Sequence, residues 1–170
     1  MYQSLRPLLF RMQPEQIHHL TINLLRLGGG NPVTRALIRS LFWAPQGPAV
    51  DVFGLHFPNP VGMAAGYDKE AVAWRGLASM GFGHVEIGTV TPRPQPGNPQ
   101  PRIFRLVEDE GVINRMGFPN QGAQKLLPRV RAARPYASIL GVNIGKNKTT
   151  PNEEALQDYL ALLRDFAPHA

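Results

Sequence analysis

Apolar residues recur at helical spacing through the first part of the chain. The spacing predicts three short helices, whose apolar positions are Leu5, Leu8, Leu9 and Met12, then Ile17, Leu20, Leu24 and Leu27, then Val33, Leu37 and Leu41 leading to Phe42 and Trp43. Pro14 and Glu15 suit the first turn of the second helix, and the glycines at 28–30 end it. Asn31 suits the start of the third helix. The pattern therefore predicts a helical hairpin with an apolar face.

Beyond residue 50 the pattern changes to an alternation of strands and helices. The predicted core units are strand 61–66 with helix 71–80, strand 81–92 with helix 121–133, and a strand within 137–148 with helix 153–166. Two small hairpins are also predicted, one at 50–60 with its turn at Gly54 and one at 103–115 around an acidic turn. Strand and helix in alternation are typical of an α/β protein with a parallel sheet.

Each core strand ends in residues that suit contact with a ligand. The ends read Gly66-Tyr67-Asp68-Lys69, then Gly88-Thr89, then Asn143-Ile144-Gly145-Lys146. In α/β proteins, ligands bind at the carboxyl ends of the strands. Small residues and glycine allow a planar ligand to lie close to the backbone, and Lys69 would meet its negative charge. The pattern therefore predicts a ligand site at this edge of the sheet.

Composition narrows the class of protein. The chain has 170 residues, enough for one domain with a core, and contains no cysteine, so disulfides and thiolate metal sites are excluded and no metal is expected. The net charge of +6 is concentrated in residues 1–50, which hold five arginines and the single acid Glu15. Because these arginines lie among leucines rather than exposed aromatic residues, we expect no nucleic-acid partner. No signal peptide or membrane-spanning stretch is predicted.

Two interpretations of the basic helical hairpin remain open on this pattern. In the first, the hairpin is a cap that packs on the main domain through its apolar face. In the second, the leucines and phenylalanine enter the surface of an anionic membrane while the arginines meet lipid headgroups.

Four motifs give the chain a resemblance to a known family. They are NPVGMAAGYDK, GFGHVEIGTVTPRPQPGNPQPRIFRL, GVINRMGFPNQG and GVNIGKNK, in this order. Together they resemble the quinone-dependent (class 2) dihydroorotate dehydrogenases, from about Tyr2 to the end. The resemblance implies an α/β fold of the (β/α)8 TIM-barrel family, here its first three βα units after an N-terminal helical hairpin. It divides the chain into an amphipathic membrane and quinone-site segment, 1–44, and the first part of an FMN-binding barrel, 45–170.

The function that the resemblance implies is that of a flavoprotein oxidoreductase. Members of the family oxidise dihydroorotate to orotate through FMN, in pyrimidine biosynthesis, and pass the electrons to a membrane quinone. The resemblance thus implies a monomeric peripheral membrane protein, on the cytoplasmic face of the inner membrane, with its N-terminal helices on the anionic lipid surface.

Site residues follow from the resemblance position by position. The expected FMN-binding residues are Ala65, Gly66, Tyr67, Asp68, Lys69, Thr89 and Asn143. The expected substrate-binding residues are Lys69, Asn114, Arg115, Met116, Gly117 and Phe118. Arg105 is expected at the mouth of the quinone tunnel. Without the resemblance, Thr89 and Asn143 would be strand-end caps, Arg105 a surface charge, and Lys69 part of an exposed pair at a helix start.

The resemblance also implies that the catalytic base of the family is not among residues 1–170. In the family, a serine in the segment that would follow Ala170 removes the C5 proton of the substrate, so no catalytic base is expected within residues 1–170. We therefore expect this chain alone to have little or no dehydrogenase activity and to bind FMN weakly. The alternative is a non-catalytic fragment that binds a membrane surface, with the βα units as a scaffold.

Overall fold

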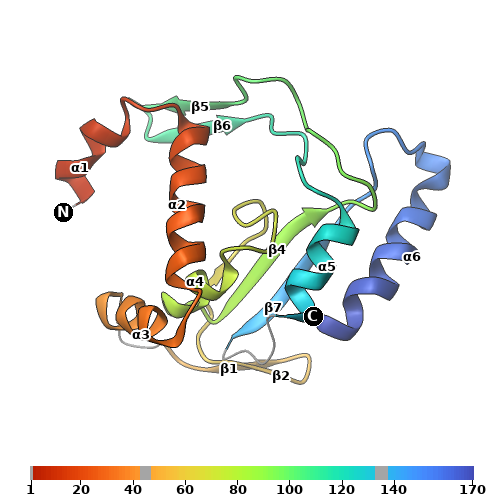
Figure 1. Ribbon diagram of the computed structural model, residues 1–170, viewed down its shortest axis with the longest axis horizontal. Helices are drawn as coiled ribbons and strands as arrows, with labels where there is room; N and C mark the ends of the chain where they lie inside the picture. The colour runs from red at the N-terminus through yellow and green to blue at the C-terminus, as the bar shows by residue number, and fades with distance from the viewer. Residues whose placement is uncertain (1, 43–46, 133–137) are drawn as a thin grey trace.

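The computed structural model describes residues 2–42, 47–132 and 138–170 (Figure 1). Its helices are α1 (Tyr2–Leu9), α2 (Pro14–Gly28), α3 (Pro32–Leu41), α4 (Trp74–Ser79), α5 (Ala123–Arg131) and α6 (Ala155–Phe166), with 3-10 turns at Asn152–Glu154 and Ala167–His169. Its strands are β1 (Val50–Val52), β2 (Leu55–Phe57), β3 (Gly62–Met63), β4 (His84–Val90), β5 (Ile103–Leu106), β6 (Gly111–Asn114) and β7 (Ile139–Ile144). Trp43 and the predicted boundary at residue 44 lie outside the described residues.

The three N-terminal helices form where the sequence predicts them. Pro14 lies in the first turn of α2, and the chain leaves the helix at Gly29. The side chain of Asn31 caps α3 by accepting a hydrogen bond of 2.9 Å from the Thr34 backbone N–H. The Thr34 hydroxyl donates to the carbonyl of Gly28 at 2.6 Å, which fixes the turn between α2 and α3. In the described part of the chain, no helix combines the length and the apolar character that crossing a bilayer requires.

A parallel sheet in the order β3-β4-β7 forms the centre of the α/β part. Val85 and Ile87 of β4 are fully buried, and they share one core with Leu77 of α4, Leu126 of α5 and Phe166 of α6. All three helices therefore cover the same face of β4. Because successive side chains of a strand point to opposite faces, Glu86 lies on the other face. The α/β class, with a helical hairpin before three βα units, is confirmed.

The two antiparallel hairpins also match their predictions. β1 pairs with β2 through a turn in which Phe53 and Gly54 both have positive φ, as a tight two-residue hairpin turn requires. β5 pairs with β6 around the acidic turn, and this hairpin lies beside the loop after α1 (Figure 1).

Two predicted elements are shorter than expected. The strand predicted for 61–66 is regular only at Gly62–Met63, because the Ala65 N–H turns to a Glu86 side chain and Gly66 adopts a φ of +99°. The helix predicted for 71–80 begins only at Trp74. The carboxylate of Asp68 accepts the backbone N–H groups of Val72 and Ala73 at 3.0 and 2.8 Å, and so replaces the first helical turn with a loop.

Glycines allow α2 and α4 to pack in direct backbone contact. A Cβ atom on Gly76 would lie 2.3 Å from the Leu25 carbonyl oxygen, and one on Gly29 would lie 2.6 Å from the Gly76 nitrogen. Because the neighbouring atoms belong to the backbone at both positions, no flexible side chain could move aside to make room for a Cβ atom. This contact sets the distance between the helical hairpin and the sheet.

We predict that Gly76→Ala destabilises the protein by about 1–3 kcal/mol, the usual range for overpacking. The matched control is Gly111→Ala, because a Cβ atom there would have its nearest neighbour at 3.7 Å. Urea unfolding of both variants tests this prediction. Equal stability of the two variants would contradict the close contact between α2 and α4.

Candidate functional site

The ends of β3, β4 and β7 are joined by the carboxylate of Glu86. The Ala65 backbone N–H donates to Glu86 Oε2 at 3.0 Å, and the Asn143 side-chain amide donates to Glu86 Oε1 at 3.3 Å. One side chain of the central strand thereby fixes a residue on each neighbouring strand. The sequence interpretation missed Glu86. The sequence pattern that could have indicated Glu86 is an acidic residue between Val85 and Ile87, two apolar residues of a buried strand.

A second pair of contacts brings Thr89 and Gly66 to the same edge. The Thr89 hydroxyl donates to the Asn143 side-chain oxygen at 2.7 Å. The Gly66 N–H donates to the Gly88 carbonyl at 2.8 Å. A Cβ atom on Gly66 would have no neighbour within 4 Å, so open space lies beside its backbone. Four of the predicted cofactor residues, Ala65, Gly66, Thr89 and Asn143, are therefore brought together around an open strand edge.

Tyr67 and Asp68 point away from this edge. The Tyr67 hydroxyl donates to Thr21 Oγ1 on α2 at 2.9 Å, and its ring meets His18 edge-on with centroids 5.2 Å apart. Asp68 is 1 % exposed, and burial raises the pKa of its carboxyl although backbone N–H groups oppose the rise. Tyr67 thus connects the first strand to the helical hairpin, while Asp68 shapes the loop before α4.

Lys69 is half-buried, and its charge interacts with that of Glu15 in the first turn of α2. Burial lowers the pKa of its ammonium group, the charge of Glu15 opposes that shift, and the charge of Arg102 adds to it. Burial, followed by the charge of Lys69, also lowers the pKa of His18 to about 4. His18 therefore carries no charge near neutral pH, and Lys69 is the cation on this side of the strand edge.

An ion pair holds the start of α2 to Arg102, the residue before strand β5. Arg102 Nη2 lies 2.6 Å from Glu15 Oε1, and the two side chains are only 10 % and 12 % exposed. The Gln100 amide donates to the other Glu15 oxygen at 2.9 Å. The side-chain hydrogen bond from Arg102 is the main cause that holds the pKa of Glu15 below its ordinary value of 4.5.

The predicted substrate residues 114–118 form a loop fixed to the proline-rich segment. Asn98 donates from its side chain to the Arg115 carbonyl at 2.8 Å, and from its backbone to the Met116 carbonyl at 2.9 Å. Gly117 and Phe118 both have positive φ, and Phe118 is 61 % exposed. Asn114 is exposed, and its side-chain oxygen accepts the Met116 N–H at 3.4 Å. No hydrogen bond in the described residues connects Asn114 with Lys69.

Arg105 joins β5 to the segment between α1 and α2. Its guanidinium donates to the Met12 carbonyl at 2.8 Å and lies over the Phe10 ring, 4.5 Å from the centroid. It therefore contacts the segment between α1 and α2 and is not a free surface charge, while its place at the mouth of a quinone tunnel stays a prediction.

Buried amides that sequence reasoning missed hold the loops beyond β4 and β7. Asn120 and Asn147 are 5 % and 2 % exposed, and both bond the Thr91 hydroxyl, at 2.9 and 3.2 Å. The Asn147 N–H also donates to Asp158 of α6 at 2.9 Å. An asparagine after a strand gives little signal of burial. Among the described residues, no group of three or more His, Asp or Glu side chains is arranged to hold a metal ion.

Fold and geometry together define an α/β protein with a candidate ligand site at the carboxyl ends of parallel strands. The sequence model of the dihydroorotate dehydrogenase family matches residues 48–170. This chain belongs to the dihydroorotate dehydrogenase family.

Similar proteins place the chain within the quinone-dependent branch. It is 55 % identical over 170 residues to the dihydroorotate dehydrogenase (quinone) of Azotobacter vinelandii and 53 % identical over 171 residues to that of Roseiflexus. Each comparison covers 100 % of this chain but 48 % and 47 % of the relative. The chain therefore spans about half the length of the curated relatives it matches.

Solved structures agree with the sequence comparisons. DHODH from Eimeria tenella, in complex with ferulenol, is similar with a TM-score of 0.76 and 35 % identity, over 96 % of this chain and 44 % of that chain. The ligand-free form from the same organism gives a TM-score of 0.74 and 37 % identity, over 92 % of this chain and 43 % of that chain. The expected resemblance is confirmed.

We predict that Glu15→Gln lowers the free energy of unfolding at pH 7 by about 1.5–3 kcal/mol, the range for hydrogen bonds to charged groups. The pKa of Glu15 is lowered on folding, so its stabilising effect is present above the ordinary value of 4.5 and is lost as the pH falls through the lowered pKa. The difference between wild type and variant should therefore vanish in acid.

Urea unfolding, from pH 7 down to acid below 4.5, measures the free energy of unfolding of wild type and variant. Glu108→Gln in the exposed acidic turn is the matched control. A difference that persists unchanged in acid would show that the Glu15 carboxylate is not the stabilising group.

Proposed function

We propose that this chain is the part of a quinone-dependent dihydroorotate dehydrogenase that binds one side of FMN and carries the quinone entrance. The observation that carries the proposal is the open strand edge at Gly66, where Glu86 binds both Ala65 and Asn143 and Thr89 binds Asn143. The comparisons support the family, and the finer assignments below are our own. FMN, when bound, would supply the redox chemistry by accepting electrons from dihydroorotate and passing them to the quinone.

The residues at the strand edge fit a flavin. Open space beside the Gly66 backbone admits a flat ring at close range, where a side chain would exclude it. The Asn143 amide suits the edge of a pyrimidine ring because an amide offers both a donor and an acceptor. Glu86 and Thr89 hold this amide from two sides, so its orientation is set before any ligand arrives. We therefore assign FMN contact to Ala65, Gly66, Thr89 and Asn143.

Lys69 would supply the positive charge of the site. Its partial burial lowers the local dielectric constant, which strengthens its interaction with a nearby anion. The substrate and product carry a carboxylate, and a reduced flavin carries negative charge, so either is a suitable partner. We place the substrate against Lys69 and the 114–118 loop, whose Asn114 side chain is exposed and has polar groups to offer.

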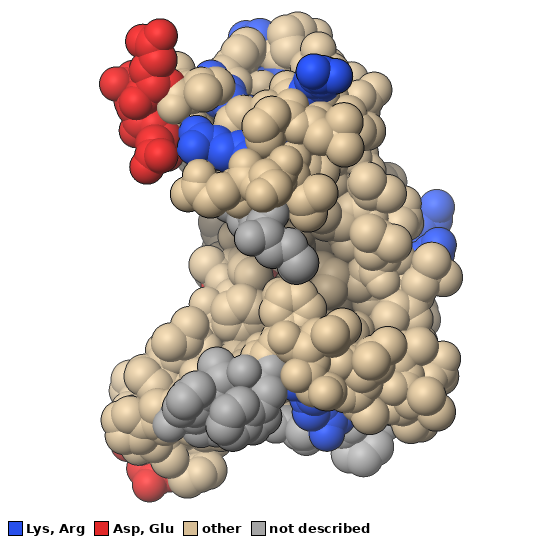
Figure 2. All heavy atoms as spheres, turned by 90° about the vertical axis from the view of Figure 1, so that its left-hand side faces the viewer, with Lys and Arg blue, Asp and Glu red and all other residues tan. Residues whose placement is uncertain are grey.

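We assign the contacts with the quinone and with the membrane surface to the N-terminal helices. Leu27, Val33 and Leu41 are 66 %, 78 % and 71 % exposed, a large apolar exposure for a helical segment of this length. Figure 2 shows the face that carries these helices: it is hollowed, and Lys and Arg are scattered over it rather than dense. We propose that a monomer rests on an anionic membrane through this face, on the cytoplasmic side of the inner membrane, and that a lipid-soluble quinone enters beside Arg105.

The test is turnover of dihydroorotate with a quinone acceptor by the full-length protein. We predict that Lys69→Ala lowers kcat by about 10²–10³-fold, the range for loss of one preorganised group that stabilises developing charge. Lys125→Ala is the control, because Lys125 is exposed on α5. Absence of turnover in the wild type, together with retained binding to vesicles, would favour the non-catalytic membrane module instead.

Arg105 gives a separate prediction on the quinone side. We expect Arg105→Ala to raise the KM for quinone, because Arg105 fixes the chain at Met12 between the two helices of the proposed entrance. Reduction of the flavin by dihydroorotate, followed in the absence of quinone, should remain near the wild-type rate. Arg164→Ala on α6 is the control. An equal loss in both half-reactions would contradict the assignment of Arg105 to the quinone side.

A further inference from the structure

The side chain of Gln95 bonds two segments that the proposed function assigns to different ligands. Its Nε2 donates to the carbonyls of Gly117 and Phe118, at 3.3 and 3.1 Å, in the loop assigned to the substrate. Its Oε1 accepts the Asn147 side-chain amide at 3.2 Å and the Lys148 backbone N–H at 3.0 Å. These two residues follow strand β7, whose end is assigned to FMN. One side chain therefore connects the substrate loop with the flavin strand.

The partners of Gln95 determine which way its amide points. A backbone N–H can only donate, so it must face Oε1, and backbone carbonyls can only accept, so they must face Nε2. The backbone of Gln95 is held as well, because its N–H and its carbonyl exchange hydrogen bonds of 3.0 Å with Asn120. Each polar group of Gln95 therefore has a partner, and the residue is fixed before any ligand arrives.

The second half of the substrate loop depends on polar contacts for its position. Phe118 is 61 % exposed, so apolar packing holds it only weakly, and Gly117 has no side chain to pack. The Phe118 carbonyl accepts the Asn120 side-chain amide at 2.9 Å in addition to Gln95. Because Asn120 is itself paired with the Gln95 backbone, both donors belong to one arrangement.

The first half of the loop is held by a different residue. Its carbonyls accept hydrogen bonds from Asn98, and the Asn98 side-chain oxygen accepts one from Lys148 Nζ at 3.3 Å. This bond is a second link to the segment after β7, but it is exposed, and water competes for both groups. Gln95 is half-buried, so its link is the better protected of the two.

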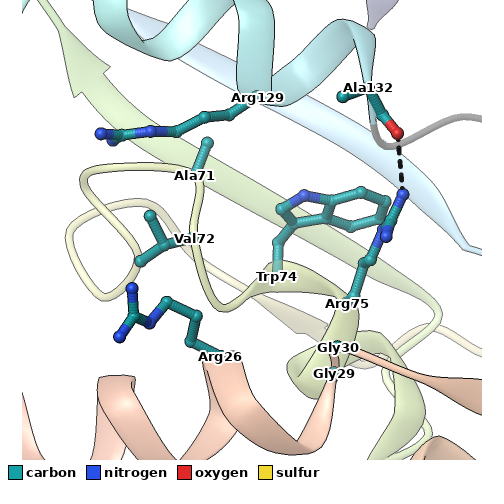
Figure 3. Close-up of a pocket in the computed structure, with 9 residues that line it drawn as sticks. All are labelled: Arg26, Gly29, Gly30, Ala71, Val72, Trp74, Arg75, Arg129 and Ala132. Atoms are coloured by element: carbon teal, nitrogen blue, oxygen red, sulfur yellow. Dashed lines mark hydrogen bonds between the residues drawn. The ribbon is translucent and has the colours of Figure 1, made fainter.

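The elements on either side of this arrangement are rigid. Asn147 is 2 % exposed, and its backbone N–H donates to Asp158 of α6 at 2.9 Å. The substrate loop leads into α5, and the end of α5 is attached to α4 by the bond of 2.9 Å from Arg75 to the Ala132 carbonyl (Figure 3). A change at Gln95 should therefore move the loop between these anchors and leave the sheet and the helices in place.

We propose that Gln95 is a positioning residue, which holds the substrate loop in register with the end of β7. The inference rests on the proposed function, which assigns Asn114 to the substrate and Asn143 to FMN. Two reactants that must stack need both of their binding surfaces in register, and a small displacement of either lowers the rate. A loop that is in place for only a fraction of the time also weakens substrate binding by that fraction.

The variant that isolates this role is Gln95→Glu in the full-length protein. Its carboxylate still accepts from Asn147 and Lys148, but it has no hydrogen to donate to the two loop carbonyls. Gln124→Glu is the matched control, because it makes the same change of charge at an exposed position of α5. If Gln95→Glu fails to fold, Gln95→Met replaces it, since Met has a similar size and no donor, with Gln124→Met as its control.

The first measurement is trypsin cleavage after Arg115, which is exposed within the loop. Because a protease cuts an opened, extended segment, the cleavage rate follows the population of the opened loop. We expect about 10-fold faster cleavage in Gln95→Glu, since two hydrogen bonds that hold the loop are lost, and the wild-type rate in Gln124→Glu. Equal cleavage rates in the two variants would overturn the proposal. This readout depends on neither ligand nor turnover.

The second measurement is the binding of orotate, followed through the flavin absorption band. We expect the Kd for orotate and the KM for dihydroorotate to rise about 10-fold in Gln95→Glu, while flavin content and reoxidation of the flavin by quinone stay near wild-type values. Loss of flavin together with orotate affinity would show a general structural role and overturn the proposal. Equal orotate affinity in wild type and Gln95→Glu would overturn the positioning role alone. A wild type that binds no orotate would overturn the proposed function and this role with it.

Discussion

The rest of this structure depends on how the short strand β3 is held to the sheet beyond its two regular residues. One backbone hydrogen bond, from the Gly66 N–H to the Gly88 carbonyl, continues the connection to β4. The carboxylate of Glu86 adds to it by accepting the Ala65 N–H on one side and the Asn143 amide on the other. Glu86 is half-buried, and a carboxylate in that position is stabilised by a donor on each oxygen, whereas removal of either donor would leave part of its desolvation cost without compensation. The arrangement of the proposed flavin edge follows from this one side chain.

The helical hairpin is attached to that edge by contacts of two kinds. Glycine contacts at Gly29 and Gly76 set its distance from the sheet. Polar contacts set its orientation, through the Glu15–Arg102 ion pair and the bond from Tyr67 to Thr21. A wall of the proposed quinone entrance is therefore joined directly to the loop after β3 that carries Lys69. Changes in the hairpin should consequently be felt at the strand edge without any movement of the sheet core.

Much of this could be predicted from the sequence, because hydrophobic period and turn residues are local signals. They gave the three N-terminal helices, the Asn31 cap, both hairpins and the order of the βα units. They failed where a distant side chain replaces a local backbone bond. Asp68 shortens the predicted helix at 71–80, and Glu86 diverts the end of the predicted strand at 61–66. The rule that ligands bind at strand ends predicted the grouping of Ala65, Gly66, Thr89 and Asn143. The direction of Tyr67 towards α2 could not be predicted, because it depends on packing between elements that are distant in the sequence.

The most direct test of the central claim is the visible absorption spectrum of the full-length protein, recorded without oxygen. The account predicts a flavin band that is bleached by dihydroorotate and restored by a quinone, with the yellow colour lost when Glu86→Ala releases Asn143 and Ala65. A wild-type protein without a flavin band, or with a band that dihydroorotate leaves unchanged, would contradict it.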